Sequence, residues 1–190
     1  MLGWNEEIKK ELGSCGQNVF IGHNVMVSDP YNVHLGDNVR IDPFTLITTK
    51  LKTGSNVHIT AYAMLGGGGS HKITLGDWSF IGYGSKLFCA SEDYSGDHGP
   101  VNEFWGSNKI FRGDISIGDY AGIASDVMLM PGVNIPNGCT IGAKSFVHTR
   151  QKLHGWAVYY GNPPEFKRNR DAQIVKEKSK SKEFCKWQTS

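Results

Sequence analysis

The 190-residue sequence has no long hydrophobic run and almost no net charge. No apolar stretch approaches the roughly 18 residues that a membrane-spanning helix needs. The first seven residues, MLGWNEE, are acidic and lack the pattern of a signal peptide. We therefore expect a cytoplasmic protein without a membrane span.

The charge balance argues against nucleic acid as a partner. The chain has 20 Lys and Arg against 18 Asp and Glu, which gives a net charge of +2. The positive excess is confined to the segment after residue 164, whereas a nucleic-acid-binding protein usually presents a basic face. No nucleic-acid partner is expected.

Cysteine is also scarce. The four cysteines, Cys15, Cys89, Cys139 and Cys185, form no CxxC pair and have no histidine at ligand spacing. Neither a disulfide framework nor a zinc site is predicted, so no metal is expected.

Glycine is abundant, with 24 residues, and the aliphatic residues recur with a period of six. Such a period fits neither an α-helix nor a simple strand, but it fits a three-sided coil with one inward side chain on each side and Gly, Asn or Asp at the corners. The sequence predicts stacked coils with parallel strands, a hexapeptide β-helix over residues 17–162. The longest run in register consists of Ile117, Ile123, Leu129, Ile135, Ile141 and Val147, and shorter runs link Leu35, Ile41 and Ile47, then Val57 and Ala63, then Leu75, Ile81 and Leu87.

The interruptions of the repeat predict the remaining organisation. Leu87 and Ile117 are 30 positions apart, which is five hexads, so the segment at about 88–116 is expected to leave the coil as a long loop. Residues 1–16 predict an amphipathic helix that caps the first coil. Residues 163–190 predict a helix followed by a basic tail.

These motifs resemble the hexapeptide-repeat acyltransferase superfamily. The stretches SEDYSG at 91–96 and YGNP at 160–163 are most similar to nucleotide-linked 4-amino-4,6-dideoxyglucose (viosamine) N-acetyltransferases, and more distantly to galactoside O-acetyltransferase. The resemblance implies an all-β fold, a left-handed parallel β-helix, and a homotrimer with sites between subunits. It also implies acetyl-CoA as co-substrate and a nucleotide sugar of surface-polysaccharide biosynthesis as acceptor.

The resemblance implies catalytic roles for two residues. The sugar O-acetyltransferases carry their catalytic histidine at the start of the long loop, and in this chain Glu92 takes that place. A carboxylate is a poor base toward a hydroxyl but suffices for an amine, so the replacement favours an amino sugar. His58 follows an inward residue and should point outward to the subunit cleft, where an imidazole could act as the base or lie idle at the surface. His71 and His98 could also reach the cleft, but both are expected to be bystanders.

The binding residues are also inferred from the resemblance. The loop is expected to bind the acceptor through Asp93, Tyr94, His98, Phe104 and Trp105. Coenzyme A is expected to contact Ala124, Ala143, Lys144, His148, Lys167 and Arg168. The alternatives are a sugar O-acetyltransferase, in which His58 or His98 replaces the missing loop histidine, and a non-catalytic assembly subunit.

Overall fold

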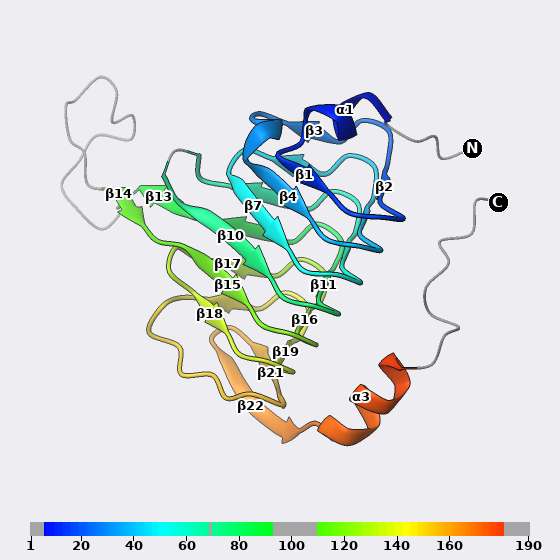
Figure 1. Ribbon diagram of the computed structural model, residues 1–190. Helices are drawn as coiled ribbons and strands as arrows, with labels where there is room; N and C mark the ends of the chain where they lie inside the picture. The colour runs from blue at the N-terminus through cyan, green and yellow to red at the C-terminus, as the bar shows by residue number, and fades with distance from the viewer. Residues whose placement is uncertain (1–5, 69, 93–109, 181–190) are drawn as a thin grey trace.

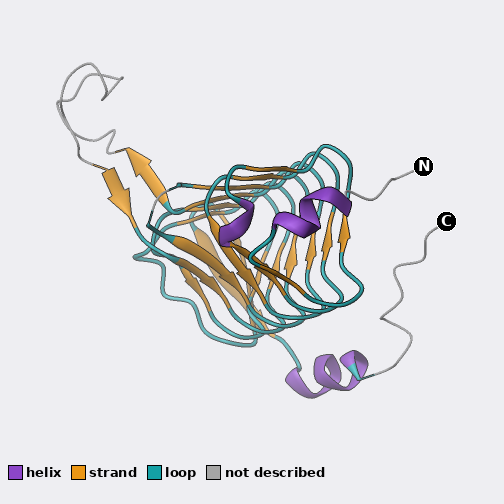
Figure 2. Ribbon diagram, turned by 45° about the horizontal axis from the view of Figure 1, so that its top comes forward, coloured by secondary structure: helices purple, strands orange, loops and turns teal. Residues whose placement is uncertain are grey.

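The computed structural model describes residues 6–68, 70–92 and 110–180. The chain winds into stacked coils with three flat sides, and the coils stack strand on strand in parallel along each side (Figure 2). The fold is the left-handed β-helix that the repeat and the family resemblance predict. No described helix is long and apolar enough to cross a membrane.

Each sheet takes one strand from every coil, so parallel neighbours within a sheet lie 18 to 22 residues apart in the sequence, or 42 across the long loop (Figure 1). Sheet A consists of β1 (Ser14–Cys15), β4 (Val33–Leu35), β7 (Lys50–Thr53), β10 (Lys72–Leu75), β15 (Ile115–Ile117) and β18 (Asn134–Ile135). Sheet B consists of β2 (Phe20–Ile21), β5 (Arg40–Ile41), β8 (His58–Ile59), β11 (Phe80–Ile81), β16 (Gly122–Ile123), β19 (Thr140–Ile141), β21 (Ala157–Gly161) and β22 (Pro164–Asn169). Sheet C consists of β3 (Met26–Val27), β6 (Leu46–Ile47), β9 (Met64–Gly66), β12 (Lys86–Phe88), β17 (Met128–Leu129) and β20 (Phe146–Val147).

The core is the column of aliphatic side chains that the repeat predicts. Ile41, Ile59, Ile81, Ile123 and Ile141 lie one above the other in sheet B and are almost completely buried. The register of the third coil differs from the prediction, because its strand residues are Thr53, Ile59 and Leu65. Val57 and Ala63 are buried too, but they occupy the small or branched position two residues before each strand residue.

The corners are held by repeated polar contacts. Asn18 donates a side-chain hydrogen bond of 2.8 Å to Asn38, which donates one of 3.1 Å to Asn56. All three have positive φ angles of 52° to 59°, a conformation that asparagine tolerates better than most residues. The ladder fixes the corner between sheets A and B in successive coils.

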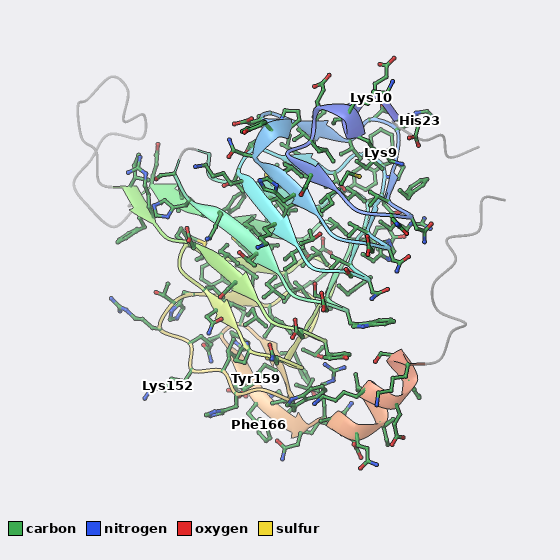
Figure 3. The ribbon with its side chains drawn as sticks, in the orientation of Figure 1. Lys9, Lys10, His23, Lys152, Tyr159 and Phe166 are labelled. Atoms are coloured by element: carbon green, nitrogen blue, oxygen red, sulfur yellow. The ribbon has the colours of Figure 1, made fainter. Side chains whose placement is uncertain are left out.

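Additional elements cover both ends of the stack. Helix α1 (Glu6–Glu11) lies at the first coil, and the 3-10 turn η1 (Pro30–Asn32) precedes β4. At the other end the sequence predicted a helix directly after the repeat, but β22 first turns back antiparallel to β21. Figure 3 shows Tyr159 and Phe166 at this end, and their rings meet edge to face at 5.9 Å. Helix α3 (Ala172–Ser179) follows, and the Asp171 side chain caps its N-terminus.

The predicted long loop leaves the coil where expected. After β12 the chain forms β13 (Ala90–Glu92), which pairs antiparallel with β14 (Ile110–Arg112) before β15 resumes the coil. This hairpin projects from the corner between sheets C and A (Figure 1). It is the only described departure from the coil between β1 and β20 that forms its own sheet.

Candidate active site

The base of the hairpin packs tightly on the coil before it. A Cβ built on Gly67 would lie 2.8 Å from the Ala90 nitrogen and the Cys89 Cβ, so only glycine allows this approach. In the hairpin register Ala90 lies opposite Arg112 and Glu92 lies opposite Ile110. Paired residues project to the same face, so Glu92 and Arg112 share one face of the hairpin.

A groove of about 520 Å³ runs below the hairpin, along the same corner of the next two coils. Its cationic lining comes from Arg112 on β14 and from Arg150, and the imidazole of His148 also lines it. The remaining lining is mostly apolar and consists of Phe111, Met130, Pro131, Gly132, Phe146 and Thr149. The groove therefore suits a ligand with both anionic and apolar parts.

His58 lies on sheet B, in a cluster of polar side chains. Its Nε2 is 2.8 Å from Oδ2 of Asp42, and the other oxygen of Asp42 accepts a 2.5 Å hydrogen bond from Nε of Arg40. The Asp42 side chain is only 5% exposed. Burial by itself would raise the pKa of this carboxyl, but the hydrogen bonds from His58 and Arg40 outweigh burial and hold the pKa below its usual value. The Phe80 ring meets His58 edge to face at 5.6 Å.

Within one chain the structure does not bring His58 and Glu92 together. His58 projects from the outer face of sheet B, whereas Glu92 lies on the hairpin at the corner of sheets C and A. A site that used both residues would need them from two copies of the chain. Arg40 and Asp42 were not foreseen, because they precede His58 by 18 and 16 residues and approach it only through the stacking of coils.

The residues predicted to contact coenzyme A lie in three separate places. Ala124, Ala143 and Lys144 lie at the corner between sheets B and C. Lys167 and Arg168 are exposed on β22, where the Lys167 ammonium lies 4.8 Å from the centre of the Tyr160 ring and 3.0 Å from Glu165. His148 lies instead in the groove below the hairpin.

The acceptor-binding residues predicted from the loop, Asp93, Tyr94, His98, Phe104 and Trp105, lie outside the described residues. Arg112, which lines the groove, was missed by the sequence analysis. The two flanks of the loop pair with each other, which no hexad spacing indicates. Within the described ranges, no three His, Cys, Asp or Glu side chains form a group that could hold a metal ion.

The chain is similar to known acyltransferases. No family model matches the chain. The chain is 29% identical over 172 residues to dTDP-4-amino-4,6-dideoxy-D-glucose acyltransferase of Escherichia coli, which covers 85% of this chain and 86% of that protein. It is 30% identical over 161 residues to a protein of Escherichia coli K12 named as the colanic acid biosynthesis acetyltransferase WcaF, which covers 84% of this chain and 71% of that one.

A solved structure agrees along almost the whole length. AntD, an N-acyltransferase from Bacillus cereus in complex with dTDP and 3-hydroxybutyryl-CoA, superposes with a TM-score of 0.82 at 30% identity, over 94% of both chains. A variant of AntD was solved with dTDP-4-amino-4,6-dideoxyglucose and coenzyme A. The coil, the extruded hairpin and these relatives together show that the chain is an enzyme of the hexapeptide-repeat acyltransferase family.

Proposed function

We propose that the enzyme transfers an acetyl group from acetyl-CoA to the amino group of a nucleotide-linked 4-amino-4,6-dideoxy sugar, of the UDP- or dTDP-viosamine type. The observation that carries the proposal is the 30% identity to AntD over 94% of both chains, together with the complexes of AntD with dTDP, the amino sugar nucleotide and coenzyme A. A cytoplasmic location and a role in surface-glycan synthesis are part of the same proposal.

The groove below the hairpin fits an acyl-CoA. Coenzyme A carries phosphates and a long, uncharged pantetheine arm, and the groove combines Arg112, His148 and Arg150 with an apolar floor. We assign the pantetheine arm to this groove and the phosphates to its cations, with Lys144, Lys167 and Arg168 of a second copy near the adenine end. The thioester supplies an activated acyl carbon, and the chain has to hold it against the acceptor nitrogen.

We assign acceptor binding to Glu92 and to the loop residues Asp93, Tyr94, His98, Phe104 and Trp105. The Glu92 carboxylate would accept hydrogen bonds from the amino group or a sugar hydroxyl and so orient the acceptor. His58, the base suggested by the sequence, would face this group across the cleft from the sheet B of a second copy.

That arrangement requires a second copy of the chain, and the homotrimer that the resemblance implies is also part of the proposal. The outer row of sheet C is apolar at five of its six positions, namely Met26, Leu46, Met64, Met128 and Phe146, with Lys86 as the exception. The corner beside it carries the exposed, stacked rings of Phe44 and Tyr62, whose centres lie 5.2 Å apart. Such a surface is typical of a protein interface rather than of a solvated face.

The test is a screen of acetyl-CoA consumption with the purified protein. The acceptors are dTDP- and UDP-linked 4-amino-4,6-dideoxyglucose, the matching 3-amino sugars, and galactosides and maltose as hydroxyl acceptors. We expect turnover with a 4-amino sugar nucleotide and an amide product by mass spectrometry. Turnover only with the plain glycosides would establish the alternative, a sugar O-acetyltransferase.

A further inference from the structure

A second histidine lies at the corner from which the hairpin emerges. Nδ1 of His71 is 3.0 Å from Oδ1 of Asp114, the second residue after β14. The same Asp114 oxygen accepts a hydrogen bond of 3.1 Å from the Lys72 backbone N–H. The His71 carbonyl in turn accepts a hydrogen bond of 2.9 Å from the Thr49 hydroxyl. The His71 ring and backbone are thus both fixed, whereas its side chain remains 30% exposed.

These contacts decide which ring nitrogen carries the proton. The hydrogen bond from the Lys72 backbone, helped by the one from His71, lowers the pKa of Asp114, so its carboxylate is ionised and can only accept. Nδ1 of the neutral imidazole must therefore be the donor, which leaves Nε2 with its lone pair. No described residue forms a hydrogen bond with this Nε2.

The dyad of His71 and Asp114 does not itself line the proposed groove, but it lies at the root of the hairpin whose Arg112 does. Gly113, next to Asp114, touches the groove wall, because a Cβ built on it would lie 2.7 Å from the Cα of Gly132. Arg112 is two residues before Asp114, and Glu92 shares the hairpin face of Arg112. An oriented imidazole with an available nitrogen therefore stands at the root of the same hairpin that carries Glu92.

We propose that His71, and not His58, is the general base of the transfer and that Asp114 positions it. The proposal rests on the proposed N-acetyltransferase function. As the acceptor nitrogen bonds to the acyl carbon, it gives its proton to Nε2 of His71. When the carbon–sulfur bond breaks, the electron pair stays on the sulfur of coenzyme A, and the imidazolium returns the proton to it. Amide and thiol are formed, and His71 is neutral again.

The kinetic test uses His71→Asn in the full-length enzyme, because an asparagine amide can still donate to Asp114 and preserve the contact. We expect kcat to fall by about 10²-fold, the usual contribution of a general base, with the KM of both substrates within about threefold. Asp114→Asn should lower kcat less, by about tenfold, because the imidazole remains. Imidazole added to His71→Gly should restore part of the lost rate, which a purely structural histidine would not allow.

The matched control is His34→Asn, which removes an exposed histidine whose Nδ1 also has a side-chain partner, Ser14, on sheet A. It should leave kcat unchanged. If His71→Asn keeps kcat within threefold of the wild type, or if imidazole fails to rescue His71→Gly, the assignment of His71 as base is overturned. A collapse of kcat in His58→Asn alone would return the role to His58.

A second readout does not depend on the substrate. In mildly alkaline buffer, ¹⁵N NMR of the histidine-labelled protein should show the proton of His71 on Nδ1, with the resonance assigned by its loss in His71→Asn. Asp114→Asn should shift this tautomer balance. A proton on Nε2 would overturn the inference even if the N-acetyltransferase activity were established. A wild-type enzyme inactive on every amino sugar would instead refute the proposed function, while the tautomer would still report on the dyad.

Discussion

Asp42 has the most constrained ionisable side chain of the sheet B cluster. It is buried, and it is bound on one oxygen by Arg40 and on the other by His58. Because these hydrogen bonds favour the ionised form, the folded chain holds the pKa of Asp42 below that of the unfolded chain. The resulting stability is present above the unfolded pKa of about 4 and is lost as the pH falls through the folded pKa.

Asp42→Asn should therefore lower the free energy of unfolding by about 1 to 3 kcal/mol at neutral pH, because two donors lose a charged acceptor. The difference from the wild type should shrink as the pH is lowered below about 4. Urea unfolding at a series of pH values measures both effects. A difference that stayed constant down to the lowest pH would mean that the carboxylate charge does not contribute.

Glu92→Gln tests the assignment of acceptor orientation. The amide keeps the size of the side chain but cannot make a charge-assisted hydrogen bond to the amino sugar. We expect the acceptor KM to rise by about tenfold or more, whereas kcat should fall by no more than threefold. Steady-state kinetics with both substrates varied provides the measurement. A collapse of kcat at unchanged KM would make Glu92 the base instead of an orienting residue.

For single residues, the side of the coil to which a side chain points was easier to predict than the residue that it contacts. The alternation of inward and outward residues correctly predicted that His58 points away from the core. Its contact with Asp42 depends on the stacking of one coil on the next, which the sequence does not encode at short range. The same holds for His71 and Asp114, which are 43 residues apart and meet only because the long loop returns to its own base.

Among the elements, the hairpin of β13 and β14 depends on the glycines of the preceding coil. Gly67 has a φ of +129° and no room for a Cβ, whereas Gly68 has a φ of +50° and its nearest atom, the Thr48 oxygen, lies 3.6 Å away. Gly67→Ala should cost about 2 to 4 kcal/mol of stability, and Gly68→Ala about 1 kcal/mol. Thermal unfolding compares the two variants. Equal effects would show that the hairpin tolerates movement away from the coil.

Strand β22 carries the basic residues assigned to coenzyme A. Arg168 is exposed, and within the described chain its guanidinium donates to the neighbouring Asn169 carbonyl. Arg168→Ala should weaken acetyl-CoA binding by about 1 to 3 kcal/mol, the worth of a charge-assisted hydrogen bond to phosphate. Isothermal titration calorimetry provides the measurement, with Lys52→Ala on sheet A as the control. Equal affinities of Arg168→Ala and the wild type for acetyl-CoA would show that Arg168 does not bind the cofactor and contributes only to solubility.

The elements were predictable to the extent that the period of six continued. One aliphatic residue per side is enough to fix the coil, its corners and the point at which the loop leaves. The predicted register of the third coil was wrong because Val57 and Ala63 are as hydrophobic as the strand residues Ile59 and Leu65, while the strand residue Thr53 is not. Strand β22 was missed because it pairs antiparallel with β21 and therefore follows no hexad.

For the whole molecule, the three sides of the coil differ in polarity, although their cores are alike. The outer row of sheet A consists of Ser14, His34, Lys52, Thr74, Ser116 and Asn134. All six are polar, in contrast to the apolar row on sheet C. Identical backbones thus present one face suited to water and one suited to protein.

A pair of matched substitutions distinguishes these faces. Met64→Glu places a charge in the middle of the apolar row on sheet C, and Thr74→Glu places the same charge on sheet A, one coil away. Both positions project outward, so neither variant disturbs the core. If sheet C forms the trimer contact, desolvating a charge there costs several kcal/mol for each interface, whereas the charge on sheet A remains hydrated.

In light scattering we expect the wild type and Thr74→Glu to have three times the chain mass. We expect Met64→Glu to dissociate and to lose activity, because its acceptor cleft lacks the second copy. If the wild-type enzyme were a monomer with full activity, the proposal of a cleft shared by two copies would be refuted, and His58 would have no role in such a cleft.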